Sequence, residues 1–220
     1  MASIQRIGAL GGTFDPIHIG HLIAAAELQH VLGLDRVLFL PAGDPPHKTE
    51  QRIAPAVHRL AMLRLAVADH QAFEASTLDL SGSGPSYTVD LLARLHEAIG
   101  PMSLVFLMGE DSLCDLPTWH QPGRIAALAE IGVARRPGVA VDMAALMAAV
   151  PEAAERVHLV SIPEIGVSSR DIRRRIAAGA PIAFQVPRAV ETYIEREGLY
   201  RSLPGVSIAE QDVTGCDSRQ

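Results

Sequence analysis

Short apolar runs alternate along the chain with longer segments in which apolar residues recur every three or four positions. Continuous runs rich in Val, Ile, Leu and Phe are typical of buried strands, and the longer periodic segments are typical of amphipathic helices. The pattern predicts strands at residues 4–10, 36–40, 103–108, 131–134 and 156–160. It predicts helices at residues 20–32, 54–69, 86–99, 119–130, 143–150, 168–178 and 189–197.

The order of these elements indicates the fold class. Strands that alternate with helices favour a Rossmann-like, doubly wound α/β fold, with a mainly parallel sheet and helices on both faces. The sequence contains no internal repeat and no linker, so residues 1–202 are expected to form a single domain. Residues 203–220 lack sustained periodicity and are expected to form a flexible C-terminal tail.

Composition excludes several classes of protein. The 220 residues are 48% hydrophobic and 20% charged, as in a globular protein. The formal net charge of −6 argues against nonspecific binding of nucleic acid. Cys114 and Cys216 are too few for a disulfide framework or a zinc site. We see no signal peptide and no run long enough to cross a membrane, so we expect a cytoplasmic protein without a membrane partner.

The segment GGTFDPIHIGH, residues 11–21, follows the first predicted strand. In a doubly wound sheet, ligands bind at the carboxyl ends of the strands, near the point where strand order reverses. Gly11 and Gly12 would let a phosphate approach the backbone, and the next helix would offer amide donors and a positive dipole end. His18 and His21 would project from its first turn on one side. The alternatives are structural histidines or half of a metal site, but the usual partner ligands are missing nearby.

A second candidate, VSSRDIRRRI at residues 167–176, opens a later helix. Ser168 and Ser169 can cap that helix and offer hydroxyl groups. Arg173 can make a forked contact with phosphate oxygens. A solvated basic helix start is the alternative, but cations lie at the unfavourable end of the helix dipole there, which favours a bound anion as their partner.

These two motifs together resemble the signature of the HxGH nucleotidyltransferase superfamily, in which the HxGH element binds ATP phosphates. Six further stretches make the chain similar to the bacterial nicotinate-nucleotide adenylyltransferases in particular: PPHK (45–48), PSYT (85–88), GEDS (109–112), LPTWH (116–120), ARRPG (134–138) and GLYR (198–201). The resemblance covers residues 4 to about 201. Arg170 replaces the usual threonine of the second motif, and His120 replaces an aromatic residue that usually follows the tryptophan.

The resemblance implies adenylyl transfer from ATP to nicotinate mononucleotide, which gives deamido-NAD and pyrophosphate in NAD biosynthesis. The implied catalytic residues are His18, His21, Lys48 and Arg173. The implied ATP- and phosphate-binding residues are Gly11, Gly12, Thr13, Phe14, His47, Gly109, Asp111, Arg136, Ser168 and Ser169. The implied nicotinate-nucleotide-binding residues are Ser86, Tyr87, Thr88, Trp119, His120 and Arg135. Mg²⁺ is expected to arrive with ATP, without ligands from the protein, because no carboxylate cage is visible.

Three other interpretations stay open at this point. One is a different nucleotidyltransferase, such as the pantetheine-phosphate enzyme, which is typically shorter and would not need the PSYT, GEDS and PTWH set. A fragment of a class I aminoacyl-tRNA synthetase is disfavoured because Lys48, the only lysine, leaves no KMSKS-like loop. The third is a nucleotide-binding regulator without activity. A homo-oligomer is among the options that the sequence leaves open.

Overall fold

The computed structural model describes residues 5–43, 53–80, 87–135 and 141–201. Within these ranges six strands form one parallel sheet in the order β3-β2-β1-β4-β5-β6. The strands are β1 (Arg6–Gly12), β2 (Arg36–Pro41), β3 (Phe73–Ala75), β4 (Ser103–Gly109), β5 (Glu130–Arg135) and β6 (Val157–Ser161). The predicted fold class is confirmed, and the sheet is parallel throughout.

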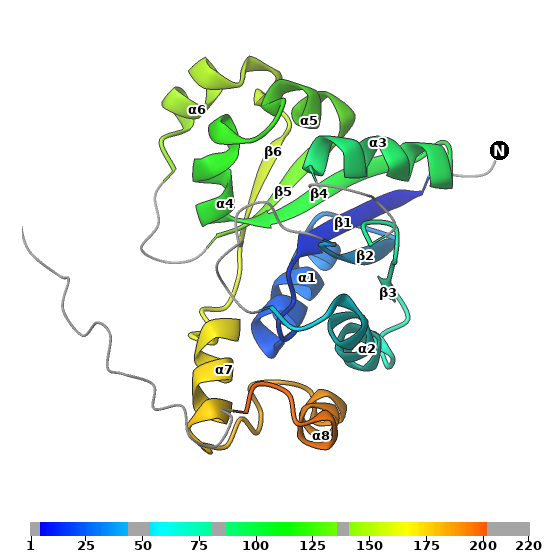
Figure 1. Cartoon of the computed structure of the whole chain (residues 1–220). Helices are drawn as coiled ribbons and strands as arrows, with labels where there is room; N and C mark the ends of the chain where they lie inside the picture. The colour runs from blue at the N-terminus through cyan, green and yellow to red at the C-terminus, as the bar shows by residue number, and fades with distance from the viewer. Residues whose placement is uncertain (1–4, 44–52, 81–86, 136–140, 202–220) are drawn as a thin grey trace, which may run out of the picture.

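Helices cover both faces of the sheet (Figure 1). The first face carries α3 (Thr88–Ile99), α4 (Glu110–Asp115), α5 (Pro122–Leu128) and α6 (Met143–Ala149). The second face carries α1 (Ile19–Val31), α2 (Ala56–Val67), α7 (Ser169–Ala177) and α8 (Arg188–Glu197). Two short 3₁₀ turns, η1 (Leu116–Thr118) and η2 (Pro151–Ala153), lie beside α5.

The strand sequences explain why both faces are covered. In β4, Leu104 and Phe106 belong to the hydrophobic core of the first face, whereas Val105 and Leu107 belong to the core of the second. Successive side chains of a strand point to opposite faces, so a continuous apolar run has to be buried on both sides. This is why the strand appears in the sequence as an unbroken apolar segment rather than as an alternating one.

Most predicted elements are confirmed with ends shifted by a few residues, and three differences have clear causes. The helix predicted at 119–130 begins only at Pro122, because Gln121 adopts a left-handed conformation with φ 54° and Pro122 suits the first helical position. Strand β3 was missed because three residues are too short to show a period. Helix α4, six residues long, was missed for the same reason.

The strand order places the site. The chain proceeds from β1 to β2 on one side, while β4 leads to β5 and β6 on the other, so the order reverses between β1 and β4. The carboxyl ends of these strands are Gly12 and Gly109. No helix in the described part of the chain has the length and apolar character needed to span a membrane. The predicted tail at 203–220 lies outside the described residues.

Candidate active site

The turn after β1 is shaped by a glycine and an aromatic ring. A Cβ atom on Gly12 would lie 3.0–3.2 Å from ring atoms of Phe14, so any larger residue here would force that ring to shift by a few tenths of an ångström. Phe14 itself is buried and left-handed, with φ 50°. Its ring makes an edge contact with the His21 ring at a centroid distance of 5.2 Å. The Phe14 ring of this turn therefore packs against the His21 ring.

The two histidines form a stacked pair at the start of α1. Their ring centroids lie 3.7 Å apart with an angle of 25° between the planes, and His18 is only 4% exposed. The backbone N–H of His18 donates to His21 Nδ1 at 3.3 Å. Because Nδ1 accepts this hydrogen bond, the hydrogen of a neutral His21 ring is assigned to Nε2. His21 is thus oriented as a donor through Nε2.

The first amide of α1 is engaged within the protein. The Ile19 N–H donates to the Gln185 carbonyl at 3.0 Å. The sequence led us to expect the helix N-terminus to offer its amides to an anion, and for Ile19 this expectation is wrong. The reason is that the segment between α7 and α8 folds back onto the start of α1, which no local pattern reveals.

The second motif lies directly against the first. Ser168 caps α7 as predicted: its Oγ accepts from Asp171 N at 3.1 Å and donates to Asp171 Oδ2 at 2.9 Å. Ser169 Oγ instead donates to the Pro16 carbonyl at 2.9 Å. The structure therefore brings α7 to the turn that precedes the histidine pair.

Arg173 reaches the same turn. Its Nη1 donates to the Asp15 carbonyl at 2.6 Å and lies 3.7 Å from Asp15 Oδ2. The Arg173 side chain keeps 24% of its surface exposed, so the protein does not enclose it completely. A cation held in this position lowers the cost of placing a phosphate nearby.

Asp15 is a buried residue of the turn after β1 whose hydrogen bonds connect distant segments, and sequence reasoning missed this role. It is 3% exposed, and its Oδ1 accepts from the Tyr200 hydroxyl at 2.6 Å and from Ala54 N at 3.2 Å. Burial raises the pKa of Tyr200, and the neighbouring Asp15 raises it further. The only sequence signal was indirect: Tyr200 belongs to the closing GLYR stretch of the family resemblance.

Arg59, on α2, is a second residue that sequence reasoning missed. It is 2% exposed, and burial lowers its pKa while nearby Asp15 opposes that shift. A signal was available, because Arg59 precedes the buried Met62 and Leu63 by three and four positions and so shares their helix face. Its hydrogen bonds are described further below.

The expected nicotinate-nucleotide residues gather around α3 and α5. Tyr87, at the N-cap of α3, is 37% exposed, and its ring lies 4.5 Å from that of His120. Trp119 is half-buried and makes an edge contact with Phe106 at 6.1 Å. The same Phe106 ring would lie 3.6 Å from a Cβ on Gly11. Phe106 thus lies between the tryptophan and the last residues of β1.

Residues at the ends of β4 and β5 complete this edge of the sheet. A Cβ on Gly109 would meet no atom of the described residues within 4 Å. Asp111 is exposed on α4. Glu110 is buried and its Oε1 lies 3.4 Å from Arg135 Nε, which sequence reasoning did not anticipate. Arg135 is therefore oriented by an ion pair.

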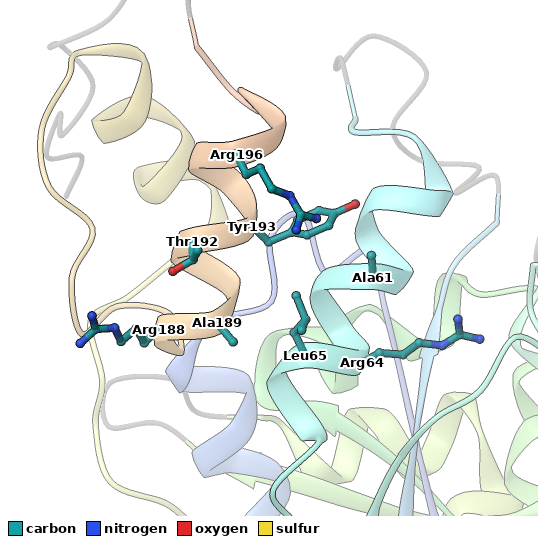
Figure 2. A pocket seen from close by; sticks show the side chains of 8 residues that line it. All are labelled: Ala61, Arg64, Leu65, Arg188, Ala189, Thr192, Tyr193 and Arg196. Atoms are coloured by element: carbon teal, nitrogen blue, oxygen red, sulfur yellow. The ribbon is translucent and has the colours of Figure 1, made fainter.

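Four expected site residues lie outside the described residues: Ser86, His47, Lys48 and Arg136. A groove of about 740 Å³ lies elsewhere, between α2 and α8 (Figure 2). It is lined by Ala61, Arg64, Leu65, Arg188, Ala189, Thr192, Tyr193 and Arg196. None of the expected site residues lines this groove. Among the described residues, no group of three or more His, Cys, Asp or Glu could hold a metal ion.

Comparison with known proteins identifies relatives over almost the whole chain. The cytidylyltransferase-like family matches residues 9–175. A protein of Thermomicrobium roseum is 56% identical over 200 residues, which are 91% of this chain and 94% of that protein. A protein of Roseiflexus sp. strain RS-1 is 50% identical over 90% of this chain and 100% of its own length. Both carry the name "probable nicotinate-nucleotide adenylyltransferase".

A solved structure supports the fold. The nicotinic acid mononucleotide adenylyltransferase of Plasmodium falciparum, in complex with NaAD, matches with a TM-score of 0.72 and covers 89% of this chain and 97% of that one. At 19% identity this likeness concerns the fold. The sequence relatives are far more similar and span nearly the full chain, so this chain belongs to the nicotinate-nucleotide adenylyltransferase family and is a nucleotidyltransferase.

Proposed function

We propose that this chain transfers the adenylyl group of ATP to nicotinate mononucleotide, giving deamido-NAD and pyrophosphate, by positioning two anions and without a general base. The observation that carries this mechanism is the contact between the two motifs. Ser169 and Arg173 of α7 bind the Pro16 and Asp15 carbonyls, two and three residues before His18, the first of the stacked histidines. Donors from opposite ends of the sequence therefore converge on one turn at the carboxyl edge of the sheet.

The chemistry explains why donors suffice. The attacking group is a phosphate monoester whose second pKa is near ~6, so it is largely dianionic at neutral pH. An oxygen of this phosphate forms a bond to the α-phosphorus of ATP, and the bond from that phosphorus to the pyrophosphate oxygen breaks. No proton has to be removed from the nucleophile. The work of the protein is to orient the two reactants and to stabilise charge on the α-phosphate and the leaving group.

We assign His18 and His21 to the oxygens around the α-phosphate. The Nε2–H of His21 is a fixed donor because the ring is held at Nδ1 and by Phe14. Arg173, the start of α7 and Lys48 are assigned to the β- and γ-phosphates. The role of Lys48, like those of the other expected residues outside the described ranges, stays a prediction.

For the second substrate, we assign Trp119 to stacking on the pyridine ring and the amides of Tyr87 and Thr88 to the nicotinate carboxylate. Tyr87 is the extended N-cap residue of α3. The first amides of a helix have no acceptor within the helix itself, so those of α3 can donate to a ligand. Helix N-terminal donors bind an anion better than a neutral group. The site is therefore expected to prefer nicotinate mononucleotide over nicotinamide mononucleotide.

Mg²⁺ is treated as part of the ATP substrate. The described side chains at the turn are imidazole, guanidinium and hydroxyl groups, and the Asp15 carboxylate is engaged by Tyr200 and Ala54. This donor set fits a cation that is held mainly by phosphate oxygens and water. Bound in that way, Mg²⁺ would neutralise charge on the polyphosphate. The cytoplasmic location, the single domain at 1–202 and the oligomeric state remain predictions.

The test is pyrophosphate release by the purified chain from ATP and nicotinate mononucleotide. We expect one pyrophosphate per deamido-NAD, and a lower rate with nicotinamide mononucleotide in the same assay. Tight ATP binding without release would favour the alternative of a nucleotide-binding regulator. Equal rates with both mononucleotides would contradict the assignment of the α3 amides to the carboxylate.

Histidine variants test the mechanism in the same assay. His18→Ala and His21→Ala should each lower kcat on the order of 10²–10³-fold, the usual cost of removing a donor to the transition state. His30→Ala provides a matched control, because His30 is exposed in the last turn of the same helix. Near wild-type turnover in both site variants would reject the proposed roles.

A further inference from the structure

The buried Arg59 binds backbone carbonyls of three separate chain segments. Its Nε donates to Ala54 O at 3.0 Å, its Nη1 to Thr13 O at 2.9 Å and its Nη2 to Gly43 O at 3.3 Å. All three nitrogens of the guanidinium are thus used inside the protein. A planar fork of donors suits such an arrangement, whereas the compact ammonium of lysine does not.

The position of these carbonyls connects Arg59 to the reaction. Thr13 directly follows β1 and belongs to the turn that leads to the histidine pair. Gly43 lies two residues beyond the end of β2, and Ala54 precedes α2. Gly43 and Ala54 flank residues 44–52, which contain His47 and Lys48 in the sequence. The Arg59 side chain therefore joins the turn after β1 to Gly43 and to Ala54, which flank the sequence segment with the only lysine.

Neighbouring contacts limit how far these segments can move apart. Both backbone groups of Ala54 are engaged: its N–H donates to Asp15, and its carbonyl accepts from Arg59. A Cβ on Gly43 would lie 2.9 Å from the Asp79 carbonyl, so the chain beyond β2 packs tightly on that side as well. With the segments packed in this way, loss of the Arg59 hydrogen bonds would remove a donor from each of three part-buried carbonyls and shift the turn.

We infer that Arg59 is a positioning residue for adenylyl transfer: it ties the turn after β1 to Gly43 and Ala54 and so fixes the position of the turn that leads to the histidine pair. It does not touch substrate, because its guanidinium is enclosed by protein. This inference rests on the proposed function. In this role Arg59 acts by holding the backbone of the site and not by contacting a substrate.

The experiment compares Arg59→Lys with Arg64→Lys in the full chain. Arg64 is exposed on the same helix and lines the groove of Figure 2, which contains none of the expected site residues, so it is a matched control. A misplacement of reacting groups by about 1 Å can cost on the order of 10²-fold in rate. We expect Arg59→Lys to lower kcat by roughly that factor and to raise KM for ATP, with KM for nicotinate mononucleotide unchanged within about twofold. Arg64→Lys should match the wild type.

The separate effects on kcat and on the two KM values distinguish a positioning role from an effect on stability alone. A merely structural role would lower the melting temperature of Arg59→Lys but leave kcat per folded molecule and both KM values at wild-type levels, and that result would overturn the inference. Should Arg59→Lys not fold, Arg59→Ala is assayed with added guanidinium ion. Recovery of turnover on guanidinium would support positioning, and recovery of folding without turnover would overturn it. An inactive wild-type chain would instead refute the proposed function itself.

Discussion

Glycine at position 20 shows how one residue shapes the histidine pair. A Cβ at this position would lie 3.1 Å from His18 Nδ1 and 3.2 Å from its Cε1. Contacts this short force one partner to shift by a few tenths of an ångström. The glycine in HIGH therefore leaves room for the His18 ring to fold over the first turn of α1 and stack on His21.

Gly20→Ala should consequently displace the His18 ring and lower kcat by about tenfold or more, while helix propensity at this position would if anything improve. Steady-state kinetics and thermal unfolding would measure the two effects. Gly166→Ala is the control, because a Cβ there would meet nothing within 4 Å. Unchanged kcat in Gly20→Ala would show that the His18 ring position is not critical.

At the scale of elements, α7 combines a cap with a docking contact. Ser168 is bonded only locally in the contacts described above, to the amide and carboxylate of Asp171, whereas Ser169 bonds across the fold to Pro16. The sequence allowed both serines to cap the helix, and the family resemblance implied that both bind phosphate. The structure separates them, because only Ser169 faces the β1–α1 turn through a described hydrogen bond.

Ser168→Ala should therefore lower the free energy of unfolding by about 1 kcal/mol, the usual value of an N-cap, with a small change in kcat. Ser169→Ala should lower kcat more, since it loosens α7 from the turn. Urea unfolding and kinetics of both variants would test this. The opposite result, a large loss of kcat with unchanged stability in Ser168→Ala, would mean that its hydroxyl acts on the ligand.

At the scale of the whole molecule, the hydrogen bond from Tyr200 to Asp15 joins the last described turn to the first functional loop, 185 positions apart. Burial and the Asp15 charge raise the pKa of Tyr200, so the folded state keeps this phenol protonated. In the unfolded chain a tyrosine loses its proton near pH 10. The contribution of Tyr200 to the free energy of unfolding is therefore fully present below about pH 10 and decreases as the pH rises above it.

We expect the free energy of unfolding to fall above about pH 10, with Tyr200 contributing at most ~1.4 kcal/mol per pH unit. Tyr200→Phe should lack this contribution, and at neutral pH it should be less stable by about 1–3 kcal/mol, because the buried Asp15 loses a donor. Urea unfolding between pH 8 and about pH 11 would measure both effects. Tyr87→Phe, at an exposed ring, should keep the alkaline slope of the wild type. Equal slopes in all three proteins would contradict the assignment.

The sequence by itself determined the features that depend on neighbouring residues. Apolar periodicity placed most of the strands and helices, with β3 and α4 missed, and their alternation placed the HIGH segment at the carboxyl edge of a parallel sheet. The Ser168 cap was also readable, because its partner Asp171 is three residues away. Such features are local, so the chain order already contains them.

Only the tertiary structure decided how the loops are held. Arg59 binds carbonyl oxygens, and Ile19 donates to another, but every residue type carries a backbone carbonyl, so these partners leave no trace in the sequence. Asp15 and Tyr200 meet only because the chain after α8 returns to the turn after β1. The residue types proposed for the site can therefore be identified from local sequence, whereas the packing that supports them depends on long-range contacts that bring distant backbone together.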